Sequence, residues 1–160
     1  MNVAIAEYGA GNVRSVALAF QRLGAELTDD VRGADLAVLP GVGSARAALA
    51  GLRARGHDEA LRERVEAGLP VLGICLGLLR GRSVRLREGR VPRMGWADVD
   101  ERGAFYFAHS YAAETPCATA WSEGIVAEAR SGSFVGVQFH PEKSGAAGAR
   151  FLEAECRSLV

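Results

Sequence analysis

The first half of the chain alternates between short apolar runs and longer segments in which apolar residues recur at helical spacing. The apolar runs cover residues 3–6, 36–39 and 70–74, and the first two lead directly into turns rich in glycine. Short apolar runs bounded by turn residues are typical of buried strands. Strands that alternate with helices at this interval predict a parallel sheet with helices on both faces.

Polar residues stand where the predicted helices begin. Asn12 precedes apolar positions at helical spacing that end before Gly24, and Ser44 precedes a second segment of the same kind. Side-chain oxygens at such positions can cap a helix, and a glycine favours its termination. A third segment begins at Asp58. We therefore expect three helices before the third apolar run.

The second half of the chain has a different pattern. Residues 83–86 and 104–107 have the composition of strands, and short polar or glycine-bearing links separate them. This arrangement favours a mixed or antiparallel extension of the sheet. Residues 134–139 form another apolar run, and residues 146–159 carry apolar side chains at helical spacing. The sequence thus predicts an α/β fold that closes with a strand and a helix.

Length and charge limit the classes of function. A chain of 160 residues with 49% hydrophobic residues can bury one core, so we expect a single domain over residues 1–160. Basic and acidic residues number 19 each, so no net charge would attract nucleic acid or an anionic membrane. No apolar run approaches the ~20 residues that span a bilayer, and the first residues lack a signal-peptide pattern. We expect a soluble, cytoplasmic protein that binds neither nucleic acid nor membranes.

The cysteines suit chemistry better than crosslinking. Cys75, Cys117 and Cys156 are odd in number and lack the spacing of a metal site. Reduced thiols therefore fit the sequence better than a disulfide framework does. We expect no bound metal and no cofactor, which leaves a thiol available for catalysis.

A cysteine flanked by glycines is the sharpest local signal. The sequence Gly-Ile-Cys-Leu-Gly at residues 73–77 places Cys75 at the end of a buried strand. This pattern is typical of a nucleophile elbow, in which a strained turn needs small neighbours and a following helix favours the thiolate. The alternative is a small core residue, because free cysteine is commonly buried. The flanking glycines favour Cys75 as a nucleophile.

A histidine and a carboxylate follow the last apolar run. His140 and Glu142 stand two residues apart in the sequence Gln-Phe-His-Pro-Glu at residues 138–142. A nucleophilic cysteine needs a base, and the base needs an acceptor that orients it. Considered alone, such a segment is more often a surface turn. Together with Cys75 it predicts a triad in which His140 is the base and Glu142 orients it.

The turn after the second apolar run completes the candidate site. Gly41, Val42 and Gly43 follow Pro40 and leave backbone N–H groups open to a ligand, as an oxyanion hole requires. The alternative is an ordinary turn between a strand and a helix. Open parallel sheets bind ligands at the carboxyl ends of their strands, and all three segments fall there. We therefore expect them to form one site.

These motifs together resemble the triad class of glutamine amidotransferases, in which Gly-Ile-Cys-Leu-Gly carries the nucleophile and His-Pro-Glu the other two residues. Within that class, further segments resemble the glutaminase subunit of imidazole glycerol phosphate synthase. They are residues 8–12, 40–43, 94–96, 109–111 and 138–145. The resemblance spans nearly the whole chain. It implies a three-layer, flavodoxin-like α/β fold with a mixed, mostly parallel sheet flanked by helices.

The resemblance also implies an activity and a partner. Members of this family hydrolyse glutamine to glutamate and ammonia and pass the ammonia to a (β/α)8-barrel synthase subunit in histidine biosynthesis. The partner then makes imidazole glycerol phosphate and an aminoimidazole carboxamide ribotide. Such glutaminases are usually held weakly active until the partner is bound and occupied.

Matching positions assign further residues by the same resemblance. Six match the oxyanion and substrate-binding positions, namely Gly41, Val42, Gly43, Leu76, Ser110 and Tyr111. Four match positions toward the partner interface or ammonia exit, namely Asn12, Trp96, Tyr111 and Lys143. Considered alone, Trp96 is more often a core residue and Lys143 a solvated charge.

Two stretches are shorter than the family pattern. After Cys75 the family continues into a glutamine and a substantial helix, whereas here residues 78–81 lead almost at once into a strand. A crossover between parallel strands needs a dozen or more residues. The stretch after Trp96 is short as well. We therefore expect segments to be absent near residues 78–80 and 97–104.

Two other functions remain open from the sequence. The first is the glutaminase part of another amidotransferase, for anthranilate, carbamoyl phosphate, GMP or pyridoxal phosphate synthesis, although residues 8–12 and 94–96 argue against it. The second is a non-catalytic redox-sensing or partner-binding α/β protein that uses a reactive Cys75. A sensor needs no Glu142, whereas an amidotransferase loses glutamine hydrolysis when His140 or Glu142 is changed.

Overall fold

A computed structural model describes residues 1–41, 45–75, 81–87 and 89–159. Within these ranges the helices are α1 (Val13–Arg22), α2 (Ala45–Ala54), α3 (His57–Glu66), η1 (Asp100–Arg102), η2 (Pro141–Lys143) and α4 (Gly145–Leu159). Strands of the first half are β1 (Asn2–Ile5), β2 (Glu26–Thr28), β3 (Leu36–Leu39) and β4 (Val71–Ile74). Strands of the second half are β5 (Arg82–Arg85), β6 (Arg93–Asp98), β7 (Ala104–His109), β8 (Tyr111–Glu114), β9 (Ala118–Ser122), β10 (Ile125–Ser131) and β11 (Phe134–Val137).

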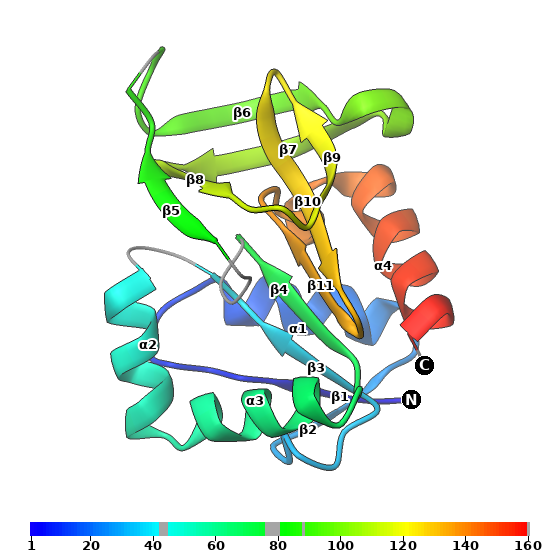
Figure 1. The fold of residues 1–160 in the computed structure, drawn as a ribbon. Coiled ribbons are helices and arrows are strands. Elements are labelled where there is room, and N and C mark those ends of the chain that lie inside the picture. Colours follow the sequence, from blue (N-terminus) through cyan, green and yellow to red (C-terminus); the bar gives the residue numbers. More distant parts are fainter. Residues whose placement is uncertain (42–44, 76–80, 88, 160) are drawn as a thin grey trace.

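The main sheet has seven strands in the described part of the chain, in the order β2-β1-β3-β4-β11-β10-β9 (Figure 1). The five strands from β2 to β11 are parallel, and β10 and β9 continue the sheet in antiparallel pairing. The order of the parallel part is that of flavodoxin-like folds. The predicted α/β class with a mixed, mostly parallel sheet is therefore confirmed.

Helices cover both faces of the parallel strands, which gives three layers (Figure 1). Along β3, Leu36 and Val38 pack on the side of α1 and α4, whereas Ala37 and Leu39 pack on the side of α2 and α3. This alternation follows from the two-residue period of a strand. All four side chains of β3 are buried, as expected of a strand covered on both faces.

A third apolar cluster joins the β6-β7 hairpin to the main sheet. The rings of Phe105 on β7 and Phe139 after β11 lie with centroids 4.2 Å apart, and Phe151 on α4 lies 5.2 Å from Phe139. Val137, the last residue of β11, belongs to the same cluster. Aromatic burial of this kind is a large stabilising contribution. It fixes the end of β11, from which the segment with His140 emerges.

The described part of the chain departs from the sequence prediction in several details. Asn12 stands at the N-cap of α1 as expected, but its side chain makes no capping hydrogen bond. The run at residues 134–139 ends as a strand at Val137, and the predicted cap Ser44 lies outside the described residues. Five strands escaped individual prediction, namely β2, β6, β8, β9 and β10. No helix in the described ranges has both the length and the apolar character needed to cross a bilayer.

Candidate active site

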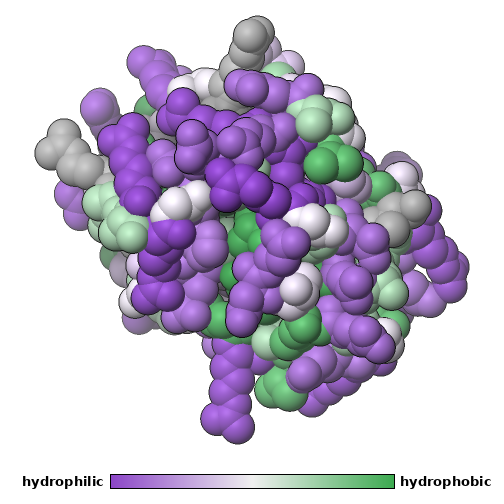
Figure 2. All heavy atoms as spheres, turned by 90° about the horizontal axis from the view of Figure 1, so that it is seen from below, coloured by the Kyte–Doolittle hydropathy of each residue, from purple (hydrophilic) through white to green (hydrophobic). Residues whose placement is uncertain are grey.

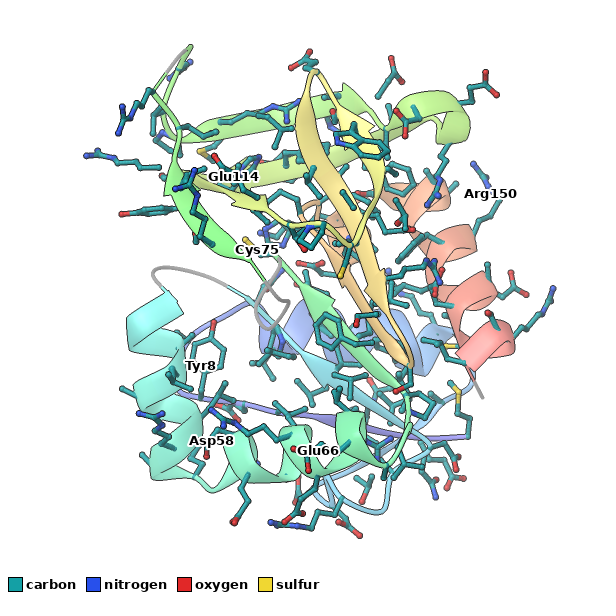
Figure 3. All side chains as sticks on the ribbon, in the orientation of Figure 1. Tyr8, Asp58, Glu66, Cys75, Glu114 and Arg150 are labelled. Atoms are coloured by element: carbon teal, nitrogen blue, oxygen red, sulfur yellow. The ribbon has the colours of Figure 1, made fainter. Side chains whose placement is uncertain are left out.

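Cys75 directly follows β4, and its backbone has the left-handed conformation of an elbow. Its φ angle is +63°, a region that costs energy for any residue with a Cβ. Figure 3 shows the residue at the tip of β4, between the α/β layers and the upper strands. The predicted elbow conformation is therefore present. The helix expected after it would begin within residues 76–80, which lie outside the described residues.

Gly41, at the carboxyl end of β3, lies against this elbow. A Cβ added at Gly41 would stand 2.8 Å from the Cβ of Cys75 and 2.2 Å from the carbonyl oxygen of Ile74. Glycine is therefore required here for steric reasons, and the turn after β3 reaches the nucleophile as predicted. Val42, Gly43 and Leu76, the other predicted oxyanion residues, lie outside the described residues.

His140 and Glu142 form a buried pair after β11. Nδ1 of His140 lies 2.9 Å from Oε1 of Glu142, and the two side chains are 3% and 0% exposed. The other oxygen of Glu142 is buried and has no hydrogen-bond partner among the described residues. Among the described residues, His140 is therefore the one hydrogen-bond partner of the Glu142 carboxylate. The negative charge of this carboxylate favours the protonated imidazole. Because Nδ1 is occupied, Nε2 is the nitrogen left for Cys75.

The surroundings of His140 change its protonation strongly. Burial lowers the pKa of His140, but hydrogen bonds to Cys75 and Glu142 and the charges of those two groups outweigh it and raise the pKa to about 9. An imidazolium beside the sulfur favours a thiolate. The described geometry therefore places a proton-bearing imidazole beside the sulfur of the proposed nucleophile.

The segment that carries His140 is fixed by hydrogen bonds to β7. The backbone N–H of His140 donates to the carbonyl oxygen of Tyr106 over 2.8 Å. The hydroxyl of Ser144 donates to the carbonyl oxygen of His140 over 2.7 Å and accepts the N–H of Tyr106 over 2.9 Å. Helix α4 also packs closely here, since a Cβ at Gly148 would lie 1.9 Å from the carbonyl oxygen of Pro141.

Gln138 is a site residue that the sequence prediction missed. Its Nε2 donates to Sγ of Cys75 over 3.3 Å, and the residue is only 2% exposed. Residues 138 and 140 share one face of an extended segment, because side chains alternate along a strand. This period of two was the available signal, since it places Gln138 on the side of the segment that carries His140.

The sequence predicts Ser110 and Tyr111 on the substrate side. Ser110 lies between β7 and β8, and Tyr111 is the first residue of β8. The carbonyl oxygen of Ser110 accepts the N–H of Leu86, and that of Tyr111 lies 2.8 Å from Nδ1 of His109. Among the described residues, neither side chain makes a hydrogen bond to the triad. Their part in substrate binding stays a prediction.

Two predicted interface residues, Trp96 and Lys143, lie beside Tyr106. The ring of Trp96 on β6 packs edge-on against that of Tyr106, with the ring centroids 6.1 Å apart. Nζ of Lys143 lies 6.0 Å from the centroid of the Tyr106 ring. Trp96 is 59% exposed, and neighbouring Met94 is 64% exposed. By contrast, the face seen in Figure 2, which views the molecule from below Figure 1, is mainly hydrophilic, with small separate hydrophobic areas. Asn12 stands at the N-cap of α1, a helix that packs against η2.

Comparison with known proteins places the chain in a family. Residues 4–99 match the model of the CobB/CobQ-like glutamine amidotransferase domain. The chain is 37% identical over 199 aligned positions to the imidazole glycerol phosphate synthase subunit HisH of Mycobacterium tuberculosis, with 96% of each chain covered. It is 33% identical over 193 positions to the subunit of the same name from Dehalococcoides mccartyi, with 94% of each chain covered.

The alignment to the M. tuberculosis subunit is longer than the chain itself. It extends over 199 positions, against 160 residues in the chain, so that relative contains segments that this chain lacks. The alignment length does not locate these segments. The expected gaps near residues 78–80 and 97–104 therefore stay a prediction.

Solved structures agree on the fold. A glutamine amidotransferase shares it with a TM-score of 0.75 at 21% identity, with 98% of each chain covered. A glutamine amidotransferase from Thermotoga maritima gives a TM-score of 0.63 at 21% identity, covering 99% of this chain and 83% of the other. With the elbow at Cys75, the match to the domain model and the identity to the two subunits, this chain belongs to the glutamine amidotransferases and, among them, to the family of imidazole glycerol phosphate synthase HisH subunits.

Proposed function

We propose that this chain hydrolyses glutamine with Cys75 as nucleophile, His140 as acid and base, and Glu142 as the group that orients His140. The observation that carries the proposal is the chain of contacts from the buried side chains of Glu142 and His140 to Cys75 at the carboxyl edge of the sheet. Membership in the family supports glutamine as the substrate.

The first half of the proposed reaction releases ammonia. The thiolate of Cys75 attacks the carbonyl carbon of the glutamine side chain, and the carbonyl oxygen takes up the negative charge. His140 enters this step protonated, because its pKa is raised to about 9. It gives its proton to the leaving nitrogen as the C–N bond breaks. Ammonia departs, and the glutamyl group remains on the sulfur as a thioester.

The second half of the reaction restores the enzyme. Neutral His140 takes a proton from water while the water oxygen attacks the thioester carbon. The C–S bond then breaks, glutamate leaves, and the thiolate of Cys75 again faces the imidazolium of His140. The sum is glutamine and water converted to glutamate and ammonia.

In this proposal, the turn after β3 stabilises the oxyanion. Gly41 already lies against Cys75, so N–H groups of Gly41, Val42 and Gly43, with that of Leu76, are the candidate donors. Ser110 and Tyr111 are proposed to line the substrate side.

The proposed partner is a (β/α)8-barrel synthase subunit that uses the ammonia to make imidazole glycerol phosphate and an aminoimidazole carboxamide ribotide in histidine biosynthesis. The two relatives are named as subunits of imidazole glycerol phosphate synthase, which supports a two-subunit assembly. The proposed interface has exposed apolar side chains of the kind that partners cover, namely those of Met94, Trp96 and Tyr111. The exposed cation of Lys143 adds a charge to it. The three free thiols fit a cytoplasmic location.

Substitutions in the buried pair distinguish this proposal from a redox sensor. Glutamate release in the presence of the synthase subunit is measured for the unchanged chain, His140→Ala and Glu142→Gln. We expect no turnover for His140→Ala and a loss of about 100-fold or more for Glu142→Gln, because the base loses its orientation. Full turnover in both variants would contradict the proposed triad. An unchanged chain that oxidises at Cys75 but releases no glutamate would favour the sensor.

A further inference from the structure

Gln138 presents a donor to the sulfur of Cys75 from the side of β11. Its Nε2 donates to Sγ over 3.3 Å, and the residue is 2% exposed, so no bulk water competes for this contact. A primary amide nitrogen donates hydrogen bonds and accepts none. The contact is therefore stronger when the sulfur is a thiolate than when it is a thiol.

The main chain fixes the position of Gln138. Strands β4 and β11 are parallel neighbours with Ile74 opposite Val137, so the next step along both strands brings Cys75 beside Gln138. The backbone N–H of Gln138 also donates to the carbonyl oxygen of Ala127 over 2.9 Å. The backbone of Gln138 is thus fixed by β10, and its side-chain amide reaches the sulfur at the end of β4.

We propose that Gln138 is a positioning residue that holds the sulfur of Cys75 in its thiolate form and in its attacking position, as a second donor beside His140. The proposal rests on the glutaminase function proposed above. Two polar hydrogens, from Gln138 and from His140, then face one sulfur. While the thioester breaks down, sulfur again becomes an anion, and the Gln138 donor stabilises it as the leaving group.

The two donors have different parts in this arrangement. His140 must give up its proton to the leaving ammonia, so its hydrogen bond to sulfur is lost during each turnover. The amide of Gln138 does not titrate in the working pH range and keeps its hydrogens throughout. Gln138 therefore maintains the position of the sulfur at the stage when His140 is neutral.

The test replaces the donor by a side chain of similar size. Gln138→Met keeps the length of the side chain and removes the N–H groups, and Gln21→Met makes the same change at the exposed face of α1. The rate of Cys75 alkylation by iodoacetamide is measured against pH for both variants, with Cys75→Ala as the blank. We expect the profile of Gln138→Met to move to higher pH, with alkylation about tenfold slower than in the unchanged chain at pH values below both midpoints. Gln21→Met should match the unchanged chain.

A second variant covers the case in which the methionine variant does not fold. Gln138→Glu keeps the shape and places a carboxylate against the sulfur, so its profile should move further to higher pH than that of Gln138→Met. Circular dichroism shows which variants fold. An unmoved profile in a folded variant would overturn the proposal, and loss of folding in both would assign Gln138 to the fold instead.

Steady-state kinetics with the synthase subunit separate this inference from the proposed function. A folded Gln138→Met should lower kcat and leave KM for glutamine nearly unchanged, because the amide contacts the sulfur. A moved alkylation profile without any glutaminase activity in the unchanged chain would support the role of Gln138 and contradict the proposed function. Glutaminase activity in the unchanged chain together with an unmoved alkylation profile in folded Gln138→Met would support the proposed function and contradict the role of Gln138.

Discussion

The hydroxyl of Ser144 donates to the carbonyl oxygen of His140 over 2.7 Å. The same oxygen of Ser144 accepts the backbone N–H of Tyr106, whose ring contacts Trp96 and Lys143. One buried hydroxyl therefore links the base of the proposed triad to the exposed aromatic surface of β6 and β7.

Removal of this hydroxyl should affect both stability and activity. Ser144→Ala removes the acceptor of the Tyr106 N–H and one of the two hydrogen bonds to the carbonyl oxygen of His140, which keeps the N–H of Lys143. We therefore expect a loss of about 1–3 kcal/mol in the free energy of unfolding. Partner-stimulated glutamine hydrolysis should fall as well, since the carbonyl oxygen of His140 loses its hydrogen bond from Ser144. Urea denaturation and glutamate release measure the two effects. Ser158→Ala on the exposed side of α4 is the matched control, and equal behaviour of both variants would contradict the link.

The raised pKa of His140 predicts a pH-dependent contribution to stability. Because the pKa is about 9 in the folded chain and 6.5 ordinarily, the folded state holds the proton more tightly. The stabilisation is complete below pH 6.5 and is lost as the pH rises through about 9. The urea midpoint of the unchanged chain should therefore fall more between pH 6.5 and 9 than that of Cys75→Ala, in which the sulfur no longer raises this pKa.

An NMR titration checks the same prediction at the residue. The imidazole of His140 should titrate near pH 9 in the unchanged chain and at lower pH in Cys75→Ala, because one hydrogen bond and one charge are removed. Identical midpoints in the two proteins would show that the sulfur does not act on His140.

Labelling should single out one of the three thiols. A diazo-ketone analogue of glutamine is expected to alkylate Cys75, which has a base beside it. Burial, with a smaller contribution from Glu155, raises the pKa of the Cys156 thiol and so disfavours its reactive form. Mass spectrometry of the labelled protein identifies the modified residue. Preferential modification of Cys117 or Cys156 would show that the assignment is wrong.

The proposed interface predicts a loss of stimulation rather than of basal chemistry. Lys143→Ala and Tyr111→Ala should lower the stimulation by the synthase subunit, with a coupling free energy of about 1–3 kcal/mol if ordinary allosteric magnitudes hold. Lys143 is the only lysine in the sequence, so its acetylation offers a second route to the same result. Arg62→Ala on the exposed side of α3 is the control. Full stimulation in both variants would remove these residues from the interface.

The site segments could be predicted because each follows a buried strand. β3, β4 and β11 are parallel neighbours, so the turns after them meet at one edge of the sheet. Short apolar runs show such strands clearly, and the residues just after them, Gly41, Cys75 and His140, were therefore predictable as a group. Their catalytic roles rest on chemistry that the fold alone does not test.

Half-exposed strands and buried polar groups were harder to predict. The residues of β6 alternate between partly buried and exposed, so no apolar run marks this strand. Arg64 was assigned no role from the sequence, yet it is 1% exposed and its guanidinium donates to carbonyl oxygens of Val31, Ala34 and Pro70. Burial of a cation depends on carbonyls supplied by distant segments, which local spacing does not reveal.

The most direct test of the central claim measures synthesis by the complex with Cys75→Ala, using either glutamine or ammonium as the nitrogen source. The two chemistries are joined only by the transfer of ammonia, so the thiol should matter to one of them alone. We predict that glutamine-dependent formation of imidazole glycerol phosphate disappears while ammonium-dependent formation stays nearly unchanged. Equal loss of both activities would contradict the account and show Cys75 to be a structural residue.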